Sequence, residues 1–327
     1  MNEPLGFHDL PPAGFDPRCA EPEVLARCGI PPKPDAPDLA AFWTEMFAPP
    51  LAFVGPKTAL MAPAPRTVAH LRMAIARPRE TSLNWSGAYI TPRDGRQFIG
   101  VHGKWVVPAV KAPSPLPGIQ EFRSSVWIGL DGQRRYFDSS LPQIGTAQFV
   151  NPTADPPYSV WVQWWHRDAP ATHQPIILAL PTKPKDVMLA SMLVLNETRI
   201  LFLIRNATTG QMHLPFTMEA PVVSGRQVKV TGATAEWVVE RPTDPAGVLH
   251  ELADYGEVEF SRCIAVAARM PPGMPPGPGV AQNLDGARLI NMYKIEHNPS
   301  RTVIISRAAK ARATPPALDG VRTRYTG

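Results

Sequence analysis

From Asn84 onward, short runs of β-branched and aromatic residues alternate with Gly, Pro, Asp and Asn turns. The runs include FIGVHGKWVVP, SSVWIGLDG, YSVWVQWWH, DVMLASMLVL and RILFLIRN. Many such runs, separated by short turns, predict an antiparallel sandwich or barrel. The longest apolar stretch, Val187 to Ile204, is interrupted by Asn196, Glu197 and Arg199, so it predicts two strands and not a membrane span.

One of these runs shows how a strand of the predicted sheet would be placed. Alternation over residues 159–165 puts two sets of side chains on opposite faces, namely Val160, Val162 and Trp164 against Trp161, Gln163 and Trp165. Neither face is simply polar. We therefore expect one of them to form a wall of a groove.

Two regions depart from this pattern. Residues 1–80 are rich in proline and contain one short amphipathic piece, Leu39 to Phe47. They predict an extension, either an arm that anchors a few apolar side chains on a neighbouring body or a propeptide. The basic stretch RAAKAR opens a predicted solvated C-terminal tail, residues 307–327. Residues 81–306 are left as the predicted β domain.

Composition limits the class of protein further. Forty prolines among 327 residues disfavour a helical bundle, because proline lacks a backbone donor. The net charge of +5 is spread thinly along the chain and predicts no nucleic-acid partner, and no apolar run predicts a membrane partner. Three cysteines without CxxC spacing argue against a zinc site, whereas a Cys19–Cys28 disulfide and free thiols are both open.

The common catalytic and targeting motifs are missing. The sequence contains no HExxH, GxSxG, GxxxxGK[ST] or Asp-[Thr/Ser]-Gly, and its histidines lack the paired spacing of metal ligands. We therefore expect no metal and no cofactor. The start, MNEPLGFHDLPPAGFDPRCAEP, shows neither the basic nor the apolar region of a standard signal peptide.

A series of eight blocks between residues 84 and 260 forms a more specific pattern. In order, they are NWSGAYI (84–90), FIGVHGKWVVP (98–108), SSVWIGLDG (124–132), LPQIG (141–145), YSVWVQWW (158–165), IRNATTGQ (204–211), AEWVVE (235–240) and YGEVEF (255–260). The series resembles the glutamic peptidase, or eqolisin, family, whose members read W-[SG]-G-A, WVGIDG, ILQTG, YxAWYEWYP, ENxTTGQ and AExIxE.

The resemblance implies an all-β fold in which two antiparallel sheets pack as a concanavalin A-like, lectin-like jelly-roll sandwich. It also implies a catalytic dyad of one Gln and one Glu. The family's Gln falls on Gln143 of LPQIG, and its Glu falls on Glu240 of AEWVVE. The family's supporting positions fall on Trp85, Trp127 and Asp131.

These residue types suit peptide hydrolysis without a metal or a covalent nucleophile. Glu240 would take a proton from the attacking water and return it to the leaving nitrogen, while Gln143 would donate an amide N–H to the developing oxyanion. Alternation within TAEWVVE puts Glu236, Val238 and Glu240 on one face of a strand. Glu236 is thus a further candidate for support of the dyad.

Two departures from the family pattern bear on the acidity of the site. The family carries an Asp four residues after the Gln, where this chain has Ala147, and the Glu of YEWYP is replaced by Gln163. Nearby anions raise the pKa of a glutamate. Their absence predicts a Glu240 more acidic than in the relatives, with a shifted pH optimum or a changed substrate preference. Loss of catalysis is the harsher hypothesis.

Three hypotheses follow for function. The leading one is a monomeric, acid-acting endopeptidase that binds an extended polypeptide across the sheet, with Trp127, Trp161 and Trp165 as walls. The rival is a lectin-like binding module with an aromatic groove, and the third is an interaction protein with a degenerate site. Joint retention of Gln143 and Glu240 favours the peptidase. Relatives are mostly exported, but this N-terminus does not resemble an export signal, so the compartment is open.

Overall fold

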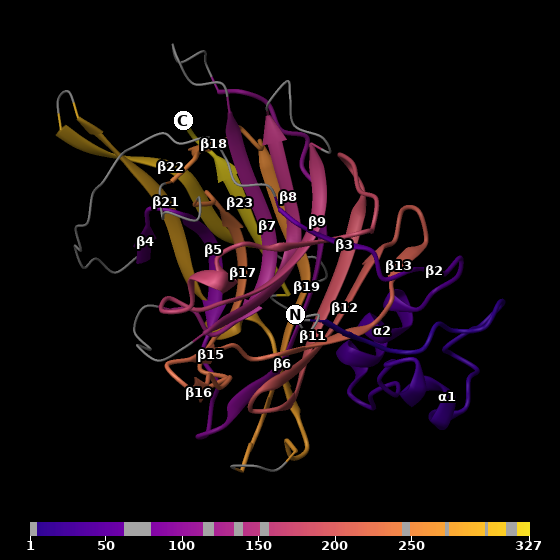
Figure 1. Cartoon of the computed structure of the whole chain (residues 1–327). Helices are drawn as coiled ribbons and strands as arrows, with labels where there is room; N and C mark the ends of the chain where they lie inside the picture. The colour runs from indigo at the N-terminus through magenta and orange to yellow at the C-terminus, as the bar shows by residue number, and fades with distance from the viewer. Residues whose placement is uncertain are drawn as a thin grey trace.

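The computed structural model describes residues 5–61, 80–113, 121–133, 140–150, 157–243, 249–271, 275–297, 300–311 and 319–327. Its strands form one long, almost wholly antiparallel ladder that folds back on itself into two packed layers (Figure 1). The order along the ladder is β3, β10, β9, β8, β7, β17, β5, β21, β22, β23, β19, β6, β11, β12, β14 and β1. The predicted all-β sandwich is confirmed.

The first layer begins at the β3 edge and ends where β21 passes the ladder on to β22. Its strands are β3 (Thr58–Leu60), β10 (Ile176–Leu178), β9 (Tyr158–Trp165), β8 (Leu141–Val150), β7 (Phe122–Leu130), β17 (Ala235–Glu240), β5 (Trp85–Ile90) and β21 (Arg288–His297). Two short strands join its neighbourhood in parallel, β4 (Glu80–Ser82) beside β21 and β18 (Glu251–Leu252) beside β7.

The second layer packs behind the first. Its strands are β22 (Ser300–Ala311), β23 (Gly320–Tyr325), β19 (Glu257–Ala268), β6 (Gln97–Val106), β11 (Val187–Asn196), β12 (Arg199–Asn206), β14 (Phe216–Glu219) and β1 (Leu5–Phe7). The remaining short elements are β2 (Ala52–Val54), β13 (Gln211–His213), β15 (Val222–Val223), β16 (Arg226–Gln227), β20 (Val280–Gln282), and the 3-10 turns η1 (Pro170–Thr172) and η2 (Leu284–Gly286).

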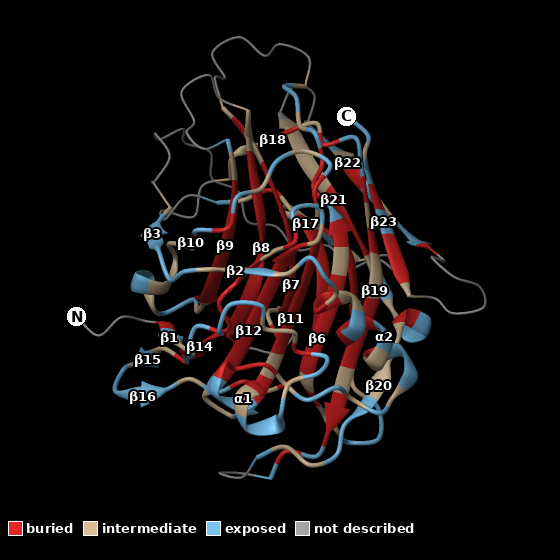
Figure 2. Ribbon diagram, turned by 90° about the vertical axis from the view of Figure 1, so that its right-hand side faces the viewer, coloured by how far each residue is buried: buried red, intermediate tan, exposed pale blue. Residues whose placement is uncertain are grey.

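Apolar side chains from both layers fill the space between them, and Figure 2 shows buried residues along the strands of both. Strand β17 illustrates the close fit, because the Trp237 indole reaches across and donates its Nε1–H to the His102 carbonyl at 2.9 Å. Gly103 lies beside this indole. A Cβ atom there would come within 2.8 Å of Ile128 Cγ2 and 3.1 Å of the Trp237 ring. Only glycine lets the two layers approach this closely at that point.

The C-terminal residues differ from the predicted tail. Residues 307–311 continue β22, and β23 pairs with both β22 and β19, so this segment belongs to the second layer. Alternation explains the difference, since Val321 and Thr323 are buried while Arg322 and Arg324 point outward. The two arginines form ion pairs with glutamates of β19. Basic residues that suggested a solvated tail are the outer face of a strand.

Residues 15–53 cover the outer face of the second layer, on the side away from the first (Figure 1). Two helices lie here, α1 (Pro22–Arg27) and α2 (Pro37–Met46), each with proline in its first turn, where a missing N–H costs nothing. The aromatic side chains Phe42, Trp43 and Phe47 are buried against apolar residues of β11 and β12. The three cysteines are free, with Cys19 exposed and no disulfide to Cys28.

A buried arginine of β12 fixes the end of α2. Arg205 donates from Nη1 to the carbonyls of Glu45 and Met46, at 3.0 and 2.9 Å, and from Nη2 to that of Pro50 at 2.8 Å. The Glu45 and Met46 carbonyls lie in the last turn of α2 and that of Pro50 follows it, so none of them accepts an i+4 hydrogen bond within the helix. One guanidinium therefore satisfies the exit of α2 and ties the N-terminal segment to the second layer.

We predict that Arg205→Ala loosens this segment. Hydrogen bonds to charged groups contribute about 1.5–3 kcal/mol each, so amide hydrogens of residues 37–47 should exchange with solvent about tenfold faster or more. Hydrogen exchange with mass spectrometry measures this effect. Arg199→Ala is the control, because Arg199 lies on the same strand with an exposed side chain. Equal exchange in the two variants would contradict the anchoring role.

Candidate active site

The outward face of the first layer carries the residues that the sequence singles out. In β17, Ala235, Trp237 and Val239 point into the core between the layers, whereas Val238 packs with Trp127 in a separate aromatic cluster. Glu236, Val238 and Glu240 therefore share the outward face, as alternation predicts. Likewise in β9, Val160, Val162 and Trp164 enter the core, and Trp161 and Trp165 join the cluster.

Strand register fixes the relative places of Gln143 and Glu240. Glu240 lies opposite Trp85 of β5 and Ser125 of β7. Gln143 of β8 lies opposite Gly129 of β7, four residues further along that strand. The two side chains thus project from the same face, two strands apart and in different rows. No hydrogen bond joins these two side chains.

The Glu240 carboxylate is held by three side-chain N–H donors. Oε1 accepts from Asn84 Nδ2 and from Trp85 Nε1, each at 3.1 Å, and Oε2 accepts from Trp127 Nε1 at 2.8 Å. Burial among aromatic rings raises the pKa of Glu240 to about 7, and the three donors oppose this rise because they favour the charged form. The rise comes from desolvation without a neighbouring carboxylate. The residue as a whole is partly exposed.

The Trp127 side chain lies between the row of residues that contains Glu240 and the row that contains Gln143. Its Nε1 binds Glu240, its ring meets that of Trp85 edge to face at 5.0 Å, and its far edge leans over Gly129. A Cβ atom on Gly129 would come within 2.9 Å of Trp127 Cζ3. Gly145 is equally confined, because its Cβ atom would lie 2.3 Å from the Val126 carbonyl oxygen. Two glycines thus leave room for one indole that spans from the glutamate toward the glutamine.

Gln143 belongs to a chain of amide groups. Its Nε2 donates to Gln163 Oε1 at 2.9 Å, and Gln163 Nε2 donates to the Thr172 carbonyl at 2.8 Å. Gln143 Oε1 is buried without a partner. The replacement of a family glutamate by Gln163 therefore leaves a hydrogen bond to Gln143 in place. Ala147, at the other departure, is buried beside Ser125 in the row of Glu240.

Asp131 makes no hydrogen bond to Gln143 or Glu240 and binds the loop that precedes β17 instead. Its carboxylate accepts from the Thr231 amide and hydroxyl at 2.7 Å each, from the Ala233 amide at 2.8 Å and from the Gly232 amide at 3.3 Å. Burial raises the pKa of Asp131, and these donors oppose the rise. The loop that it closes leads directly into β17. Asp131 thereby sets where the strand that ends in Glu240 begins.

Glu236 is fully buried on the same strand. The Thr234 hydroxyl lies near it, but neither group makes a hydrogen bond of normal geometry. Burial, together with the charge of Asp131, raises the pKa of Glu236 well above its usual range. Burial therefore disfavours the charged form of Glu236.

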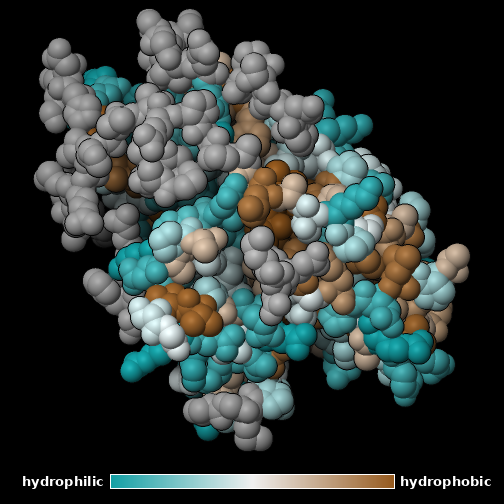
Figure 3. All heavy atoms as spheres, in the orientation of Figure 1, coloured by the Kyte–Doolittle hydropathy of each residue, from teal (hydrophilic) through white to brown (hydrophobic). Residues whose placement is uncertain are grey.

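The two remaining tryptophans differ in exposure. Trp161 is buried and donates its Nε1–H to Ser125 Oγ at 3.0 Å. It therefore lies beneath the surface of the site and is not an exposed wall of a groove. Trp165 is partly exposed and stacks on His173 at 5.5 Å. Met61, from the N-terminal segment, also packs against this aromatic cluster. Figure 3 shows apolar atoms gathered over the region where β7, β8 and β9 lie in Figure 1.

Three contributors were not identified as site residues from the sequence. Asn84 stands beside Trp85 in the first block, so the block itself was the available signal. Thr172 acts through its backbone carbonyl, and Met61 lies outside every block, so neither leaves a signal in its residue type.

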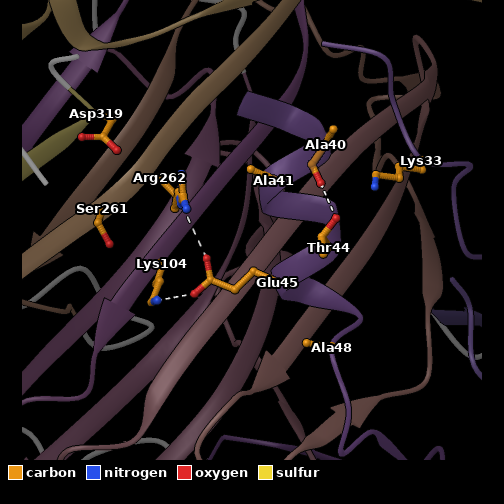
Figure 4. A pocket seen from close by; sticks show the side chains of 10 residues that line it. All are labelled: Lys33, Ala40, Ala41, Thr44, Glu45, Ala48, Lys104, Ser261, Arg262 and Asp319. Carbon is orange, nitrogen blue, oxygen red and sulfur yellow. Dashed lines mark hydrogen bonds and ion pairs between the residues drawn. The ribbon is translucent and has the colours of Figure 1, made fainter. Parts of the chain in front are cut away.

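A separate cleft of about 730 Å³ lies between α2 and the outer face of the second layer (Figure 4). Within it, Glu45 forms ion pairs with both Lys104 and Arg262. Among the described residues, no three His, Cys, Asp or Glu side chains gather as metal ligands would. Neither described helix has the length and apolar character to span a membrane.

Comparison with known proteins gives this face its context. The sequence model of the Peptidase A4 family matches residues 83–310, which is more than half of the chain. The chain belongs to the Peptidase A4 family. It is a glutamic-type peptidase, a hydrolase that acts on peptide bonds, as the resemblance implied.

Solved structures of other glutamic peptidases share the fold. Scytalido-glutamic peptidase with a transition state analogue inhibitor aligns with a TM-score of 0.53 and 18% identity, over 74% of this chain and 98% of that one. SCP-B, an eqolisin in complex with the tripeptide Ala-Ile-His, aligns with a TM-score of 0.51 and 18% identity over the same shares. No curated protein sequence matches this A4 peptidase.

We predict that Asp131 stabilises the peptidase fold strongly. Asp131→Ala would leave buried backbone N–H groups without acceptors, each at a cost of about 1–3 kcal/mol, so the free energy of unfolding should fall by about 3 kcal/mol or more. Chemical denaturation measures it. The control is Asp94→Ala, since Asp94 also has a positive φ but only an exposed ion pair with Arg96. Equal losses in both variants would contradict the role.

Proposed function

We propose that the enzyme is an endopeptidase in which Glu240 and Gln143 form the catalytic dyad. The observation that carries this proposal is the convergence of three N–H donors on the Glu240 carboxylate, whose pKa is raised to about 7 by burial. A general base works best when its pKa lies near the working pH. A glutamate with an ordinary pKa would be a much weaker base.

The proposed reaction needs only these groups and one water. Glu240 takes a proton from the water, whose oxygen attacks the peptide carbonyl carbon, and the carbonyl oxygen gains negative charge. An N–H of Gln143 Nε2 stabilises that oxyanion. Glu240 then delivers its proton to the amide nitrogen, the C–N bond breaks, and a carboxylic acid and an amine leave. Asn84, Trp85 and Trp127 stabilise Glu240 each time it is ionised.

The substrate class follows from the family and from the shape of the face. A polypeptide is the substrate of a peptidase, and the relatives named above were solved with a transition state analogue and with a tripeptide. In this chain the exposed parts of Trp85 and Trp165 flank the dyad as apolar walls for substrate side chains. Every side chain of the site comes from one chain, so we propose that a monomer is active.

We further propose that residues 15–53 of the N-terminal extension act as a stabilising arm of the peptidase domain, not as an inhibitory propeptide. The apolar side chains of α1 and α2 pack on the outer face of the second layer. The dyad lies on the outward face of the first layer. The helices therefore lie on the opposite side of the sandwich from β17, the strand that carries Glu240 (Figure 1).

The missing acids, Ala147 and Gln163, do not prevent a raised pKa at Glu240, because burial alone raises it. Comparison with relatives that keep both acids remains a prediction: Glu240 should be more acidic here than there. A strongly acidic optimum, in contrast, would require Glu240 to be ionised far below a pKa of about 7. We therefore propose a working range that extends to neutrality.

We predict that both dyad residues are essential. Glu240→Gln removes the base and should lower kcat about a thousandfold, within the usual effect of general catalysis, and Gln143→Ala should lower it about a hundredfold by loss of an oxyanion donor. Cleavage of a denatured protein, with and without pepstatin, measures this. Glu236→Gln is the matched control on the same strand and should remain active, because Glu236 is fully buried and makes no hydrogen bond to either dyad residue. Full activity of Glu240→Gln would refute the dyad.

We also predict the pH profile. Only the ionised form of Glu240 can act as base, and its pKa is raised to about 7, so kcat/KM should fall about tenfold per pH unit below that value. Trp127→Phe removes a donor that favours the charged form, so the fall should begin at higher pH. Steady-state assays from pH 3 to 9 test both statements. A kcat/KM that is constant or rises toward pH 4 would contradict them.

A further inference from the structure

Gln143 can serve the oxyanion only if its amide group has one particular orientation. A glutamine side chain ends in a carbonyl oxygen, which accepts, and an NH2 group, which donates. The two ends have nearly the same shape, so packing alone does not choose between them. In this structure Nε2 of Gln143 faces Gln163 Oε1 at 2.9 Å. Something must impose that choice.

Thr172 imposes it through Gln163. The Thr172 carbonyl accepts a hydrogen bond from Gln163 Nε2 at 2.8 Å, and a carbonyl can only accept. Gln163 must therefore turn its NH2 end to Thr172 and its oxygen to Gln143. That oxygen in turn requires the NH2 end of Gln143. The reverse orientation would bring two amide oxygens together in a buried place, where both residues have little solvent.

The Thr172 carbonyl is itself held in place by the turn that follows β9. Thr172 Oγ1 donates to the Ala169 carbonyl at 2.7 Å and accepts from the His166 amide at 3.0 Å. The ring of His173 stacks on Trp165 at 5.5 Å, and its Nε2 lies 3.0 Å from the His166 carbonyl. Residues 166–173 thus fold back onto the end of the strand that carries Gln163.

We propose that Gln163, aimed by the Thr172 carbonyl, is a positioning residue that fixes the orientation of the Gln143 amide. The inference rests on the proposed function of Gln143 as oxyanion donor. One hydrogen of Gln143 Nε2 is used by Gln163, and the second remains for the substrate. The Thr172 carbonyl, the Gln163 amide and the Gln143 amide form a chain of two hydrogen bonds. Because the first group can only accept, the donors and acceptors along this chain cannot be exchanged.

This arrangement accounts for one departure from the family pattern. A carboxylate at position 163 has only acceptors when ionised, so it would select the NH2 end of Gln143 without assistance. A glutamine at the same place could select either end. The turn at residues 166–173 supplies the Thr172 carbonyl, which fixes the orientation of the Gln163 amide. Gln163 therefore selects the NH2 end of Gln143 through hydrogen bonds, as an ionised carboxylate would through its charge.

Gln163→Met tests the relay, because it keeps the side-chain size and removes both hydrogen bonds. We expect kcat to fall about tenfold, less than for loss of the donor itself, with KM changed less than about threefold. The control is Gln148→Met, which removes a buried glutamine from the core-facing side of β8, where it bonds Thr146 and Ser124. That variant should lose stability and keep kcat. Equal kcat values for Gln163→Met and wild type would overturn the proposal.

Gln163→Glu adds a readout that a merely structural residue would not move. While its new carboxyl is protonated it can donate to Thr172 and accept from Gln143, so kcat should stay close to wild type at low pH. Once it ionises it has only acceptors, so it still selects the NH2 end of Gln143 without Thr172, and kcat should stay close to wild type there too. A kcat of Gln163→Glu as low as that of Gln163→Met would overturn the orienting role.

A measurement without substrate separates this inference from the proposed function. In full-length protein labelled with ¹⁵N-glutamine, the Gln143 side-chain NH2 should show one slowly exchanging proton. The signal should persist in Glu240→Gln and vanish in Gln163→Met. If the slow Gln143 proton behaved in this way in a protein that cleaves no peptide, the proposed function would be refuted. The proposed orientation of the Gln143 amide would still stand. Persistence of the slow proton in Gln163→Met would overturn the orientation itself.

Discussion

A carboxylate placed against aromatic rings is the constraint on which the rest of the site depends. Desolvation disfavours the charge of Glu240, and only directed N–H groups can restore part of what water would supply. Trp85 and Trp127 meet both demands, since each indole ring excludes water and each Nε1–H donates. The balance leaves a pKa of about 7. Without the rings Glu240 would be a weak base, and without the donors it would remain protonated.

The strand order of the sandwich brings the Trp85 and Trp127 rings to the Glu240 carboxylate. Asn84 and Trp85 come from the start of β5, Trp127 from β7, and Glu240 from the end of β17, which lies between those two strands. Antiparallel pairing sets the three segments side by side to within one residue. Gly129 and Gly145 then leave space for the Trp127 indole, because any Cβ atom there would meet the ring or the neighbouring strand.

Parts of the chain away from Gln143 and Glu240 hold this face in place. The second layer contacts β17 from behind through Trp237, and Asp131 closes the loop that leads into the strand. Residues 15–53 cover the outer face of the second layer, which would otherwise expose leucines of β11 and β12. Met61 then returns to the aromatic cluster beside the dyad, so the extension also shapes the edge of the binding face.

The sequence by itself determined which faces the strands would present. Alternation in residues 159–165 and 235–240 placed each side chain correctly, because a period of two is a local property of an extended backbone. The block order also indicated the family, and thereby Gln143 and Glu240. The same local pattern could not show that residues 307–311 and 320–325 complete a sheet, because their partners lie far away in the sequence.

Only the tertiary structure decided the pKa and the orientation of the two proposed catalytic groups. The raised pKa of Glu240 comes from burial, which depends on every segment that covers it. The direction of the Gln143 amide depends on a backbone carbonyl, and a carbonyl is the same in every residue type, so Thr172 leaves no trace in the sequence. Residue types set what chemistry was available, and packing set its strength and direction.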